Sequence, residues 1–444
     1  MMSAETTMTG ADAFAALAGK DPALPVGLVT DDRRLDAWMA ERGARLGARR
    51  WLRYKPETSL CASFDMTVEG ADRAELGWLL AVVPSSQSKI AKVASRAPEG
   101  SIVSFDEAGG IVLARPAADR QLAALRDPAA TMAALGLGDL TVKTVVHNPQ
   151  RRWVARARGA GRDLVIRGYT AGEAAPLVAR MRACADLGPV LPVVAFDEKR
   201  DCVAVPFVGG QVLGLPTRAA GDGRGFVASI PIAVEVGEAL GRLHATPVSA
   251  DLLDVFGQSC ETVDGIAVTS ARAAREIVDD AAGTAAMAGI LLPELVPALD
   301  DIIAELETRI PPVDATIPVS SLVLSHGDFS FDQVVLGHEG EISLIDWDRI
   351  RLAPAADDLA HAYAAGLDAD DPVAPPEFAL AMEPLWNALL KGYATVRPLP
   401  EAGELRARCA AAILTRLTQP FRRSHPQWPS HMKKFLAHAH SVLG

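Results

Sequence analysis

Apolar and polar residues alternate along much of the first half of the chain, with the two-residue period of strands that bury one face. Between residues 141 and 170 this alternation, interrupted by turns that contain Pro and Gly, predicts three consecutive strands. Residues 173–185 change to helical spacing, and residues 191–210 return to strand-like runs separated by a polar turn. The region therefore predicts a unit with the element order β-β-β-α-β-β.

A second β-rich region precedes this unit. Residues 31–49 are expected to form a short helix, and strand-like segments follow it at 51–55, 60–66, 77–84, 101–105 and 110–115. Turns containing Pro56 and Pro149 occupy similar places in the two regions, so a degenerate internal repeat is one interpretation and a chance match is the other. Residues 1–30 are expected to be a flexible tail.

From residue 211 onward, apolar residues recur every three to four positions, which predicts a largely helical region with one β insertion at 322–346. The whole pattern predicts an α+β fold in several domains. We expect a flexible N-terminal tail (1–30), an N-terminal cap domain (31–135), a β-rich lobe (136–210) and a helical lobe (211–444).

Composition narrows the range of partners. The 444-residue chain carries a net charge of -11 at pH 7, which argues against nucleic acid and mildly favours a cationic small substrate. We find no apolar run close to the ~18 residues of a membrane span and no signal peptide. The five cysteines form no Cys-x-x-Cys pair, so they indicate neither a zinc site nor a disulfide framework. We expect a cytoplasmic monomer or homodimer that binds neither membranes nor nucleic acid.

The strongest chemical signal is the segment 322–350, LVLSHGDFSFDQVVLGHEGEISLIDWDRI. A strand, a turn and a returning hairpin would bring Asp328, Gln333 and Asp346 to one edge. One carboxylate could then take a proton from a hydroxyl, while the amide oxygen and the other carboxylate could hold Mg²⁺, which prefers oxygen ligands. Positioning and charge neutralisation of this kind are what phosphoryl transfer requires.

These motifs resemble those of the aminoglycoside phosphotransferase and choline kinase family, the small-molecule branch of the protein-kinase-like enzymes. The matching residues are His-Gly-Asp at 326–328, Gln333 in the place of the family's Asn, Ile-Asp-Trp-Asp at 345–348, and Asp-Leu-Ala at 358–360. The resemblance covers roughly residues 140–440. It implies a bilobal kinase-like fold, with the β-rich lobe and the helical lobe on either side of ATP and Mg²⁺.

The resemblance also implies a role for each matching residue. Asp328 would be the catalytic base, Asp346 the main Mg²⁺ ligand and Gln333 the second ligand. His326 would brace the loop, and Asp358 would be a structural hydrogen-bond acceptor. Gln333 is a departure from the family's Asn, although it carries the same amide oxygen on one more methylene. This Gln and the extra cap are similar to the maltokinase and actinobacterial glucosamine kinase branch, which favours a sugar as the acceptor.

A second departure concerns the nucleotide. Arg167 stands where the family has the lysine that holds the α- and β-phosphates, and Arg differs from Lys in geometry. Arg167 would either hold these phosphates or point outward from an exposed strand. Glu173 would either pair with Arg167 or act as an acid at a helix N-terminus.

Two further assignments have alternatives. Pro206, Phe207 and Val208 fit the hinge whose backbone meets adenine, or they are an ordinary interdomain link. Asp348 would contact substrate or metal, or would act as a helix N-cap.

The sequence therefore predicts an ATP- and Mg²⁺-dependent phosphotransferase that acts on a hydroxyl of a sugar, an amino sugar or an aminoglycoside-like natural product. Two alternatives stay open. The first is a catalytically inactive kinase-like binding protein, which the Arg167 and Gln333 replacements favour. The second is a kinase for choline-type or nucleoside-type acceptors.

Overall fold

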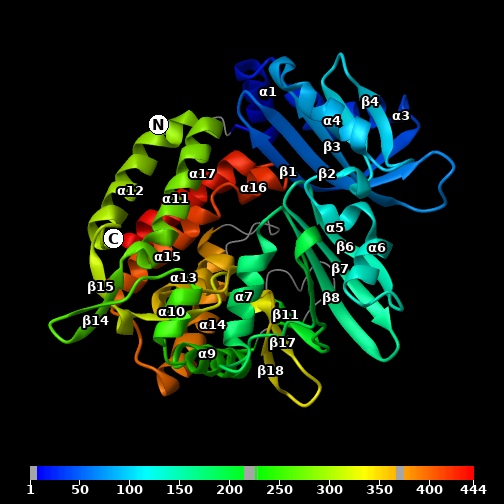
Figure 1. Ribbon diagram of the computed structural model, residues 1–444. Helices are drawn as coiled ribbons and strands as arrows, with labels where there is room; N and C mark the ends of the chain where they lie inside the picture. Colours follow the sequence, from blue (N-terminus) through cyan, green and yellow to red (C-terminus); the bar gives the residue numbers. More distant parts are fainter. Residues whose placement is uncertain (1–7, 215–225, 228, 367–374) are drawn as a thin grey trace, which may run out of the picture. The chain divides into compact units, whose positions relative to one another are not determined.

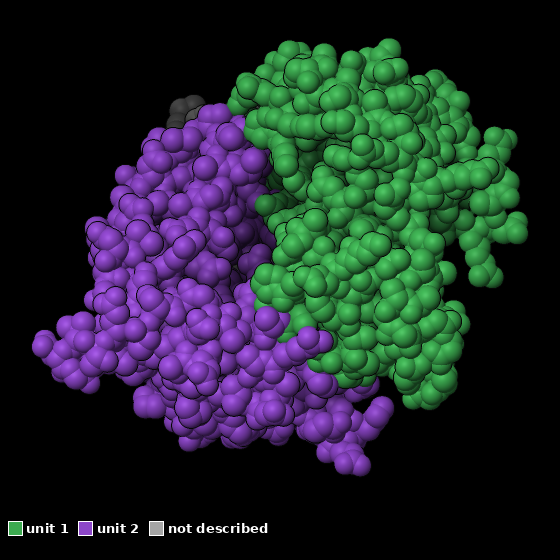
Figure 2. All heavy atoms as spheres, viewed as in Figure 1, with its two compact units in different colours: residues 1–178, 193–207, 420–430 green, residues 179–192, 208–419, 431–444 purple. Residues whose placement is uncertain are grey.

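A computed structural model describes residues 8–214, 226–227, 229–366 and 375–444. The chain divides into two compact units (Figure 2). Unit 1 comprises residues 1–178, 193–207 and 420–430, and unit 2 comprises residues 179–192, 208–419 and 431–444. The mixed α+β fold expected from the sequence is confirmed, since sheets dominate the first unit and helices the second.

The first sheet of unit 1 is antiparallel and five-stranded (Figure 1). Its strand order is β1-β2-β3-β5-β4, from β1 (Ala44–Lys55), β2 (Ser59–Val68), β3 (Glu75–Val82), β4 (Ile102–Asp106) and β5 (Ile111–Ala114). Helix α4 (Ser88–Arg96) packs Ile90 and Val93 against Trp78 and Leu80 of β3, which closes a small core.

The second sheet of unit 1 has the order β6-β7-β8-β10-β9. Its strands are β6 (Thr141–Asn148), β7 (Arg152–Gly159), β8 (Arg162–Tyr169), β9 (Ala195–Asp197) and β10 (Cys202–Pro206). The predicted order β-β-β-α-β-β is confirmed, because helix α7 (Ala174–Cys184) lies between β8 and β9. Both sheets place a helix between their third and fourth strands and use the same strand order, which supports the internal repeat.

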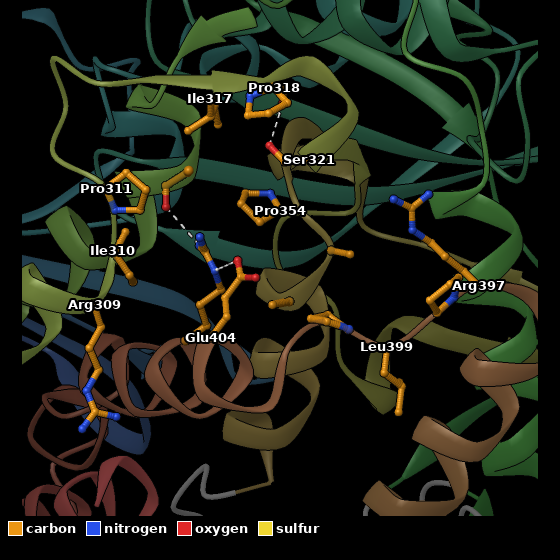
Figure 3. A pocket seen from close by; sticks show the side chains of 16 residues that line it. Arg309, Ile310, Pro311, Ile317, Pro318, Ser321, Pro354, Arg397, Leu399 and Glu404 are labelled. Carbon is orange, nitrogen blue, oxygen red and sulfur yellow. Dashed lines mark hydrogen bonds and ion pairs between the residues drawn. The ribbon is translucent and has the colours of Figure 1, made fainter. Parts of the chain in front are cut away.

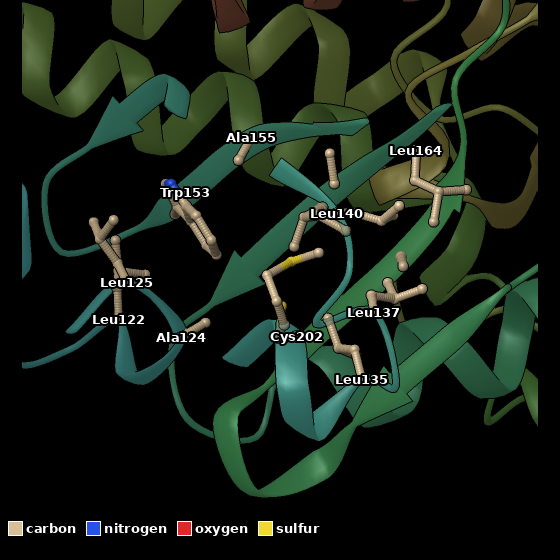
Figure 4. Packing of buried hydrophobic residues seen from close by; sticks show 14 residues of the cluster. Leu122, Ala124, Leu125, Leu135, Leu137, Leu140, Trp153, Ala155, Leu164 and Cys202 are labelled. Carbon is tan, nitrogen blue, oxygen red and sulfur yellow. The ribbon is translucent and has the colours of Figure 1, made fainter. Parts of the chain in front are cut away.

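One face of the second sheet is covered by the short helices α5 (Ala123–Arg126) and α6 (Pro128–Ala134). Leu122 and Leu125 from this segment pack in one cluster with Trp153 of the sheet (Figure 4). Met132 and Ile166 belong to the same cluster. The sequence assigned these residues to the cap, whereas their side chains belong to the core of the second sheet. We therefore propose that the boundary between the two β units lies near residue 120.

The N-terminal region differs from the expected tail. Between residues 10 and 30 the chain forms α1 (Gly10–Lys20) and α2 (Val26–Val29), followed by α3 (Asp32–Ala40). Helix α1 starts with a capping box between Thr9 and Asp12. Its Phe14 ring lies 5.7 Å from Phe421 and 5.6 Å from Trp428, so aromatic packing holds the helix in unit 1.

Unit 2 is mainly helical (Figure 1). Its helices are α9 (Ile230–His244), α10 (Ala250–Val255), α11 (Arg272–Leu291), α12 (Val296–Arg309), α13 (Ala355–Ala365), α14 (Pro375–Val396) and α15 (Ala402–Thr415). The helices α7, α16 (Gln419–Arg422) and α17 (Trp428–Leu443) contain residues of both units. In the part of the chain that the structure describes, no helix is long and apolar enough to cross a membrane.

The helical unit contains more β structure than the single insertion expected. One sheet has the order β12-β11-β17-β18, a second β13-β14-β15, and β16 pairs with β19. The strands are β11 (Gln211–Gly214), β12 (Phe226–Val227), β13 (Glu261–Val263), β14 (Ile266–Ser270), β15 (Thr316–Pro318), β16 (Leu322–Ser325), β17 (Val334–Leu336), β18 (Ile342–Leu344) and β19 (Arg351–Pro354). The expected insertion at 322–346 contains β16, β17 and β18. The other strands have two to five residues and are too short for alternation to reveal them.

Glycines let two helices of unit 2 approach closely. A Cβ atom on Gly237 of α9 would lie 2.0 Å from the carbonyl oxygen of Leu389, and one on Gly392 of α14 would lie 1.9 Å from that of Val234. The close contact brings His244 of α9 to Tyr393 of α14, with 3.0 Å between imidazole Nδ1 and the phenol oxygen. This packing positions His244 for the site described below.

Candidate active site

The hairpin of β17 and β18 sets the position of two of the expected ligands. Val334 pairs with Leu344, and the amide of Ile345 donates to the carbonyl oxygen of Gln333 at 2.9 Å. Gln333 therefore lies at the open end of the hairpin, beside Asp346. Both side chains are half-buried.

His326 ties the loop after β16 to this hairpin. Its Nε2 lies 2.8 Å from the carbonyl oxygen of Ile345, and because that oxygen can only accept, Nε2 carries the proton. The fully buried ring packs against Trp347, with 4.7 Å between the centroids. Since Asp328 follows two residues later, the three residues expected to do the chemistry come from one bonded loop region of unit 2.

Asp358, at the start of α13, holds the same loop through its backbone amides. Its carboxylate is 0 % exposed and accepts hydrogen bonds from the backbone amides of His326 at 2.7 Å and Gly327 at 2.9 Å. His244 Nε2 lies 3.0 Å from the same carboxylate. Burial by itself raises the pKa of Asp358, but the hydrogen bond from His244 and the nearby imidazoles hold it below its ordinary value.

Gly327 is required by two independent features of the backbone. Its φ is +82°, and an added Cβ would lie 2.0 Å from the carbonyl oxygen of Arg349. The left-handed conformation disfavours any L side chain, and the contact is with backbone that cannot move aside cheaply.

We expect Gly327→Ala to abolish activity and to lower the unfolding free energy by more than the about 1–3 kcal/mol of backbone strain alone. Gly340, at the tip of the β17–β18 hairpin, is a matched control because its φ is +87° and an added Cβ meets nothing within 4 Å. Urea denaturation and ATP consumption should separate the two variants. Equal losses in both would show that the contact with Arg349 is unimportant.

Asp328 lies between two guanidinium groups. Its Oδ2 is 3.9 Å from Nε of Arg349, and its Oδ1 is 3.7 Å from a terminal nitrogen of Arg416. Burial of the carboxyl raises the pKa of Asp328, but the positive charges of Arg416 and Arg349 outweigh this and hold the pKa below its ordinary value. Asp328 is therefore ionised at neutral pH.

Asp346 occupies an unusual backbone conformation. Its φ of 67° and ψ of 55° are left-handed, which is uncommon for a residue other than Gly and concentrates at functional sites. The 3-10 turn η7 (Trp347–Arg349) follows directly. Asp348 lies inside this turn, so the alternative of a helix N-cap at Asp348 is wrong.

The donor set suits Mg²⁺ better than zinc or another transition metal. Gln333 and Asp346 offer an amide oxygen and a carboxylate, and Mg²⁺ takes one or two protein ligands together with phosphates and water. Among the described residues, no group of three or more His, Cys, Asp or Glu side chains could hold a metal ion. The residues present therefore fit a metal that is bound jointly with a phosphate ligand.

The residues expected to contact the nucleotide lie partly in unit 1. On β8, Arg167 pairs with Val154 and Val203 and faces away from the core side chains of Leu164 and Ile166. Its side chain is half-buried. The exposed Glu173 directly precedes α7, in the place of a helix N-terminal acid.

The predicted hinge begins where β10 ends at Pro206. The amide of Phe207 donates to the carbonyl oxygen of Asp163 at 3.0 Å. The guanidinium of Arg156 lies 3.3 Å from the centroid of the Phe207 ring and binds both carboxylate oxygens of Asp163, at 2.8 and 2.6 Å. Val208, half-buried, is the first hinge residue of unit 2.

His361 lies on α13, three residues after Asp358, and was not singled out by the sequence. It is 4 % exposed. Its Nε2 is buried without a hydrogen-bond partner among the described residues. Burial, with Arg351 and Arg416 adding to it, lowers the pKa of His361 to about 3, although Asp328 and Asp358 oppose the shift.

We expect this histidine to lower the unfolding free energy as the pH is lowered from about 6.5 to 5. The unfolded imidazole gains a proton below about pH 6.5, whereas the folded one stays neutral, so the unfolded state binds more protons. Urea unfolding at pH 7 and pH 5 should show a smaller loss for His361→Gln than for the wild type. The exposed His338→Gln serves as control and should behave as wild type; the same loss in all three proteins would contradict the prediction.

A separate pocket of about 710 Å³ lies in unit 2 at the opposite end of β16 and β19 (Figure 3). Pro354 and Ser321 line it, and Pro354 pairs with Leu322, whereas the candidate site follows Ser325 at the other end of the strand. Four strand residues separate the two places by about 10 Å. This pocket therefore does not contain the candidate catalytic residues.

A model of the phosphotransferase enzyme family matches residues 141–399, more than half of the chain. The chain belongs to this family. The resemblance drawn from the motifs at 326–328 and 345–348 is confirmed, and the protein is a small-molecule phosphotransferase. The likeness to the maltokinase and glucosamine kinase branch stays a prediction. No curated protein sequence matches the phosphotransferase significantly.

Several solved structures resemble the phosphotransferase. A spectinomycin phosphotransferase in complex with ADP and spectinomycin is 13 % identical, over 68 % of this chain and 93 % of its own, with a TM-score of 0.42. A macrolide 2'-phosphotransferase from Brachybacterium faecium is 20 % identical (72 % and 98 % covered, TM-score 0.43). Choline kinase from Cryptosporidium parvum is 14 % identical (68 % and 89 % covered, TM-score 0.43). At these scores the family assignment depends on the sequence match alone.

Several residues of the site were not predicted from the sequence. His244 and Arg416 contact Asp358 and Asp328 from helices far away in the chain. Arg349 stands directly after the Ile-Asp-Trp-Asp motif, so its position in the sequence was the one signal that could have found it.

Proposed function

We propose that this phosphotransferase transfers the γ-phosphoryl group of ATP, with Mg²⁺, to a hydroxyl of a small molecule of the sugar, amino sugar or glycosylated natural product type. The observation that carries the proposal is the bonded loop region of unit 2. There, the hydrogen bond from Ile345 to Gln333 and the contact between His326 and Ile345 hold Gln333 and Asp346 close to the loop that carries Asp328.

Asp328 orients the acceptor hydroxyl and accepts its proton. As the new oxygen–phosphorus bond forms, the bond between the γ-phosphorus and the bridging oxygen breaks, and ADP leaves with that oxygen. The lowered pKa of Asp328 keeps the carboxylate ready to accept a hydrogen bond, which suits a reaction whose transition state needs positioning more than a strong base.

Gln333 and Asp346 would hold Mg²⁺, which supplies neutralisation of phosphate charge when bound. Asp348 lies two residues from Asp346 in the same turn, and we assign it a supporting contact with metal or substrate. Arg167 would hold the nucleotide phosphates in place of the family's lysine. The backbone of residues 206–208 would meet adenine, and the Arg156 guanidinium against Phe207 would stiffen this segment.

The test is Mg²⁺-dependent ATP consumption with a panel of hexoses, amino sugars, maltose, aminoglycosides, nucleosides and choline. Turnover with one class, lost on adding a chelator and restored by Mg²⁺, is the expected result. Turnover with choline or nucleosides would instead favour the second alternative. No turnover, together with no rise in melting temperature on adding ATP and Mg²⁺, would favour the inactive binding protein.

A further inference from the structure

The surroundings of Asp328 carry more positive charge than a general base requires. Arg349 approaches its Oδ2 from turn η7, and Arg416 approaches its Oδ1 from the C-terminal end of α15. Both guanidinium groups therefore border the place where the acceptor hydroxyl would bind. Asp280, on α11, is the carboxylate that faces Arg349 from the other side, at 3.8 Å.

The contacts of these two arginines with Asp328 are longer than those of Arg408, a buried arginine of the same unit. Arg408 reaches Asp357 at 2.5 Å and Glu404 at 2.9 Å, which are hydrogen-bond distances. The contacts of Arg349 and Arg416 with Asp328, at 3.9 and 3.7 Å, are longer than hydrogen bonds. Their role is therefore not simply to saturate the Asp328 carboxylate.

The side chain of Arg349 is accessible, and its backbone is held in place. Its side chain is 53 % exposed. Its carbonyl oxygen lies against the Cα of Gly327, and the next residue, Ile350, accepts a hydrogen bond from Arg180 at 3.2 Å. Among the described residues, the guanidinium of Arg349 makes only the two long ion contacts with Asp280 and Asp328. A guanidinium that extends from an anchored turn beside the proposed acceptor site can bind an anionic group through a pair of parallel hydrogen bonds.

We propose that Arg349 and Arg416 form an anion-binding subsite beside Asp328, and that the acceptor carries a carboxylate or phosphate near the hydroxyl that is phosphorylated. The inference rests on the proposed function and narrows its substrate class. It also reverses the preference for a cationic substrate suggested by the net charge of -11, because the local charges, not the total, face the acceptor. An amine in this position would meet two guanidinium groups.

The test uses acceptors matched in shape and different in charge: glucose, glucosamine, glucuronate and glucose 1-phosphate, and the same neutral, amine and acid series for any other scaffold that the panel identifies. The expected order of kcat/KM is acid above neutral above amine, with at least a tenfold step from neutral to acid. Comparison of glucuronate with glucose 1-phosphate shows whether the subsite prefers a carboxylate or a phosphate.

Arg349→Gln should reduce the ratio of acid to neutral kcat/KM at least tenfold. Arg242→Gln, on the exposed surface of α9, is the matched control and should leave the ratio unchanged. A preference for the amine, or an equal loss on every acceptor in Arg349→Gln, would overturn the proposal. The second result would mean that Arg349 acts on the transferred phosphoryl group.

A binding measurement separates this proposal from the proposed function. Inorganic phosphate is added to the enzyme saturated with a non-hydrolysable ATP analogue and Mg²⁺, so that the γ-phosphoryl position is already filled. The shift in melting temperature is then compared between wild type, Arg349→Gln and Arg242→Gln. A shift that is lost only in Arg349→Gln supports the subsite even if no acceptor is turned over. The same shift in all three proteins, or none in any, contradicts it, whereas failure of the proposed function appears as absence of any nucleotide effect and of turnover.

Discussion

Asp328→Asn is expected to reduce kcat by about 10²–10⁴-fold while leaving the fold and nucleotide binding in place. The amide keeps the size of the carboxylate but cannot accept the hydroxyl proton. Asp328 is 41 % exposed on its side chain, and its contacts with Arg349 and Arg416 are long, so its replacement should cost little stability. Initial rates of ATP consumption at saturating acceptor would measure the effect.

Glu339→Gln provides the matched control for the loss of one carboxylate. Glu339 is exposed at the tip of the β17–β18 hairpin, close in sequence to the site but outside it. We expect wild-type rates from this variant, and an unchanged rise in melting temperature with ATP and Mg²⁺ from Asp328→Asn. If Asp328→Asn kept more than a tenth of the wild-type kcat, another residue would have to be the base.

The parts of the site that the sequence could predict are local in the chain. Asp328, Gln333 and Asp346 lie within one strand-turn-hairpin segment, and the register of a short hairpin fixes which residues meet at its end. The contacts of His244 with Asp358, 114 residues away, and with Tyr393, 149 residues away, follow from helix packing. No spacing within the sequence encodes them.

The errors in the fold have equally specific causes. The helix expected at residues 31–49 ends at Ala40, and β1 begins at Ala44. Gly43, with a φ of +70°, marks the change, and a glycine at this distance from a helix end is a recognised stop signal. The expected tail likewise contained a helix start, Thr9 followed by Asp12, which the structure uses as a capping box.

The internal repeat is weak in the sequence and clear in the sheet topology. In sequence the two β regions share little more than a turn with Pro56 or Pro149. In the structure they share strand order and helix placement, since β1-β2-β3-β5-β4 corresponds to β6-β7-β8-β10-β9. The alternation of apolar and polar residues specifies which segments form strands. In both sheets the fifth strand, and not the fourth, pairs with the third strand. This order depends on how the intervening helix packs on the sheet, which the sequence pattern does not reveal.

The largest loss of stability is expected from Asp358→Ala. The substitution removes a 0 % exposed carboxylate that accepts from the amides of His326 and Gly327 and from His244. Each buried donor left without an acceptor costs about 1–3 kcal/mol, so the unfolding free energy should fall by about 3–5 kcal/mol at pH 7. Activity should be lost as well, because the freed amides belong to the loop that carries Asp328.

The pH dependence of this loss distinguishes Asp358 from an ordinary packing residue. The folded pKa of Asp358 lies below its unfolded value, so its contribution to stability is fully present above about pH 4 and is lost as the pH falls further. Urea unfolding of wild type and Asp358→Ala should therefore differ most near neutral pH and converge in acid, while Asp301→Ala, on the exposed face of α12, should match wild type throughout. A difference that stayed constant down to pH 2 would mean that lost volume, and not the charged acceptor, destabilises the variant.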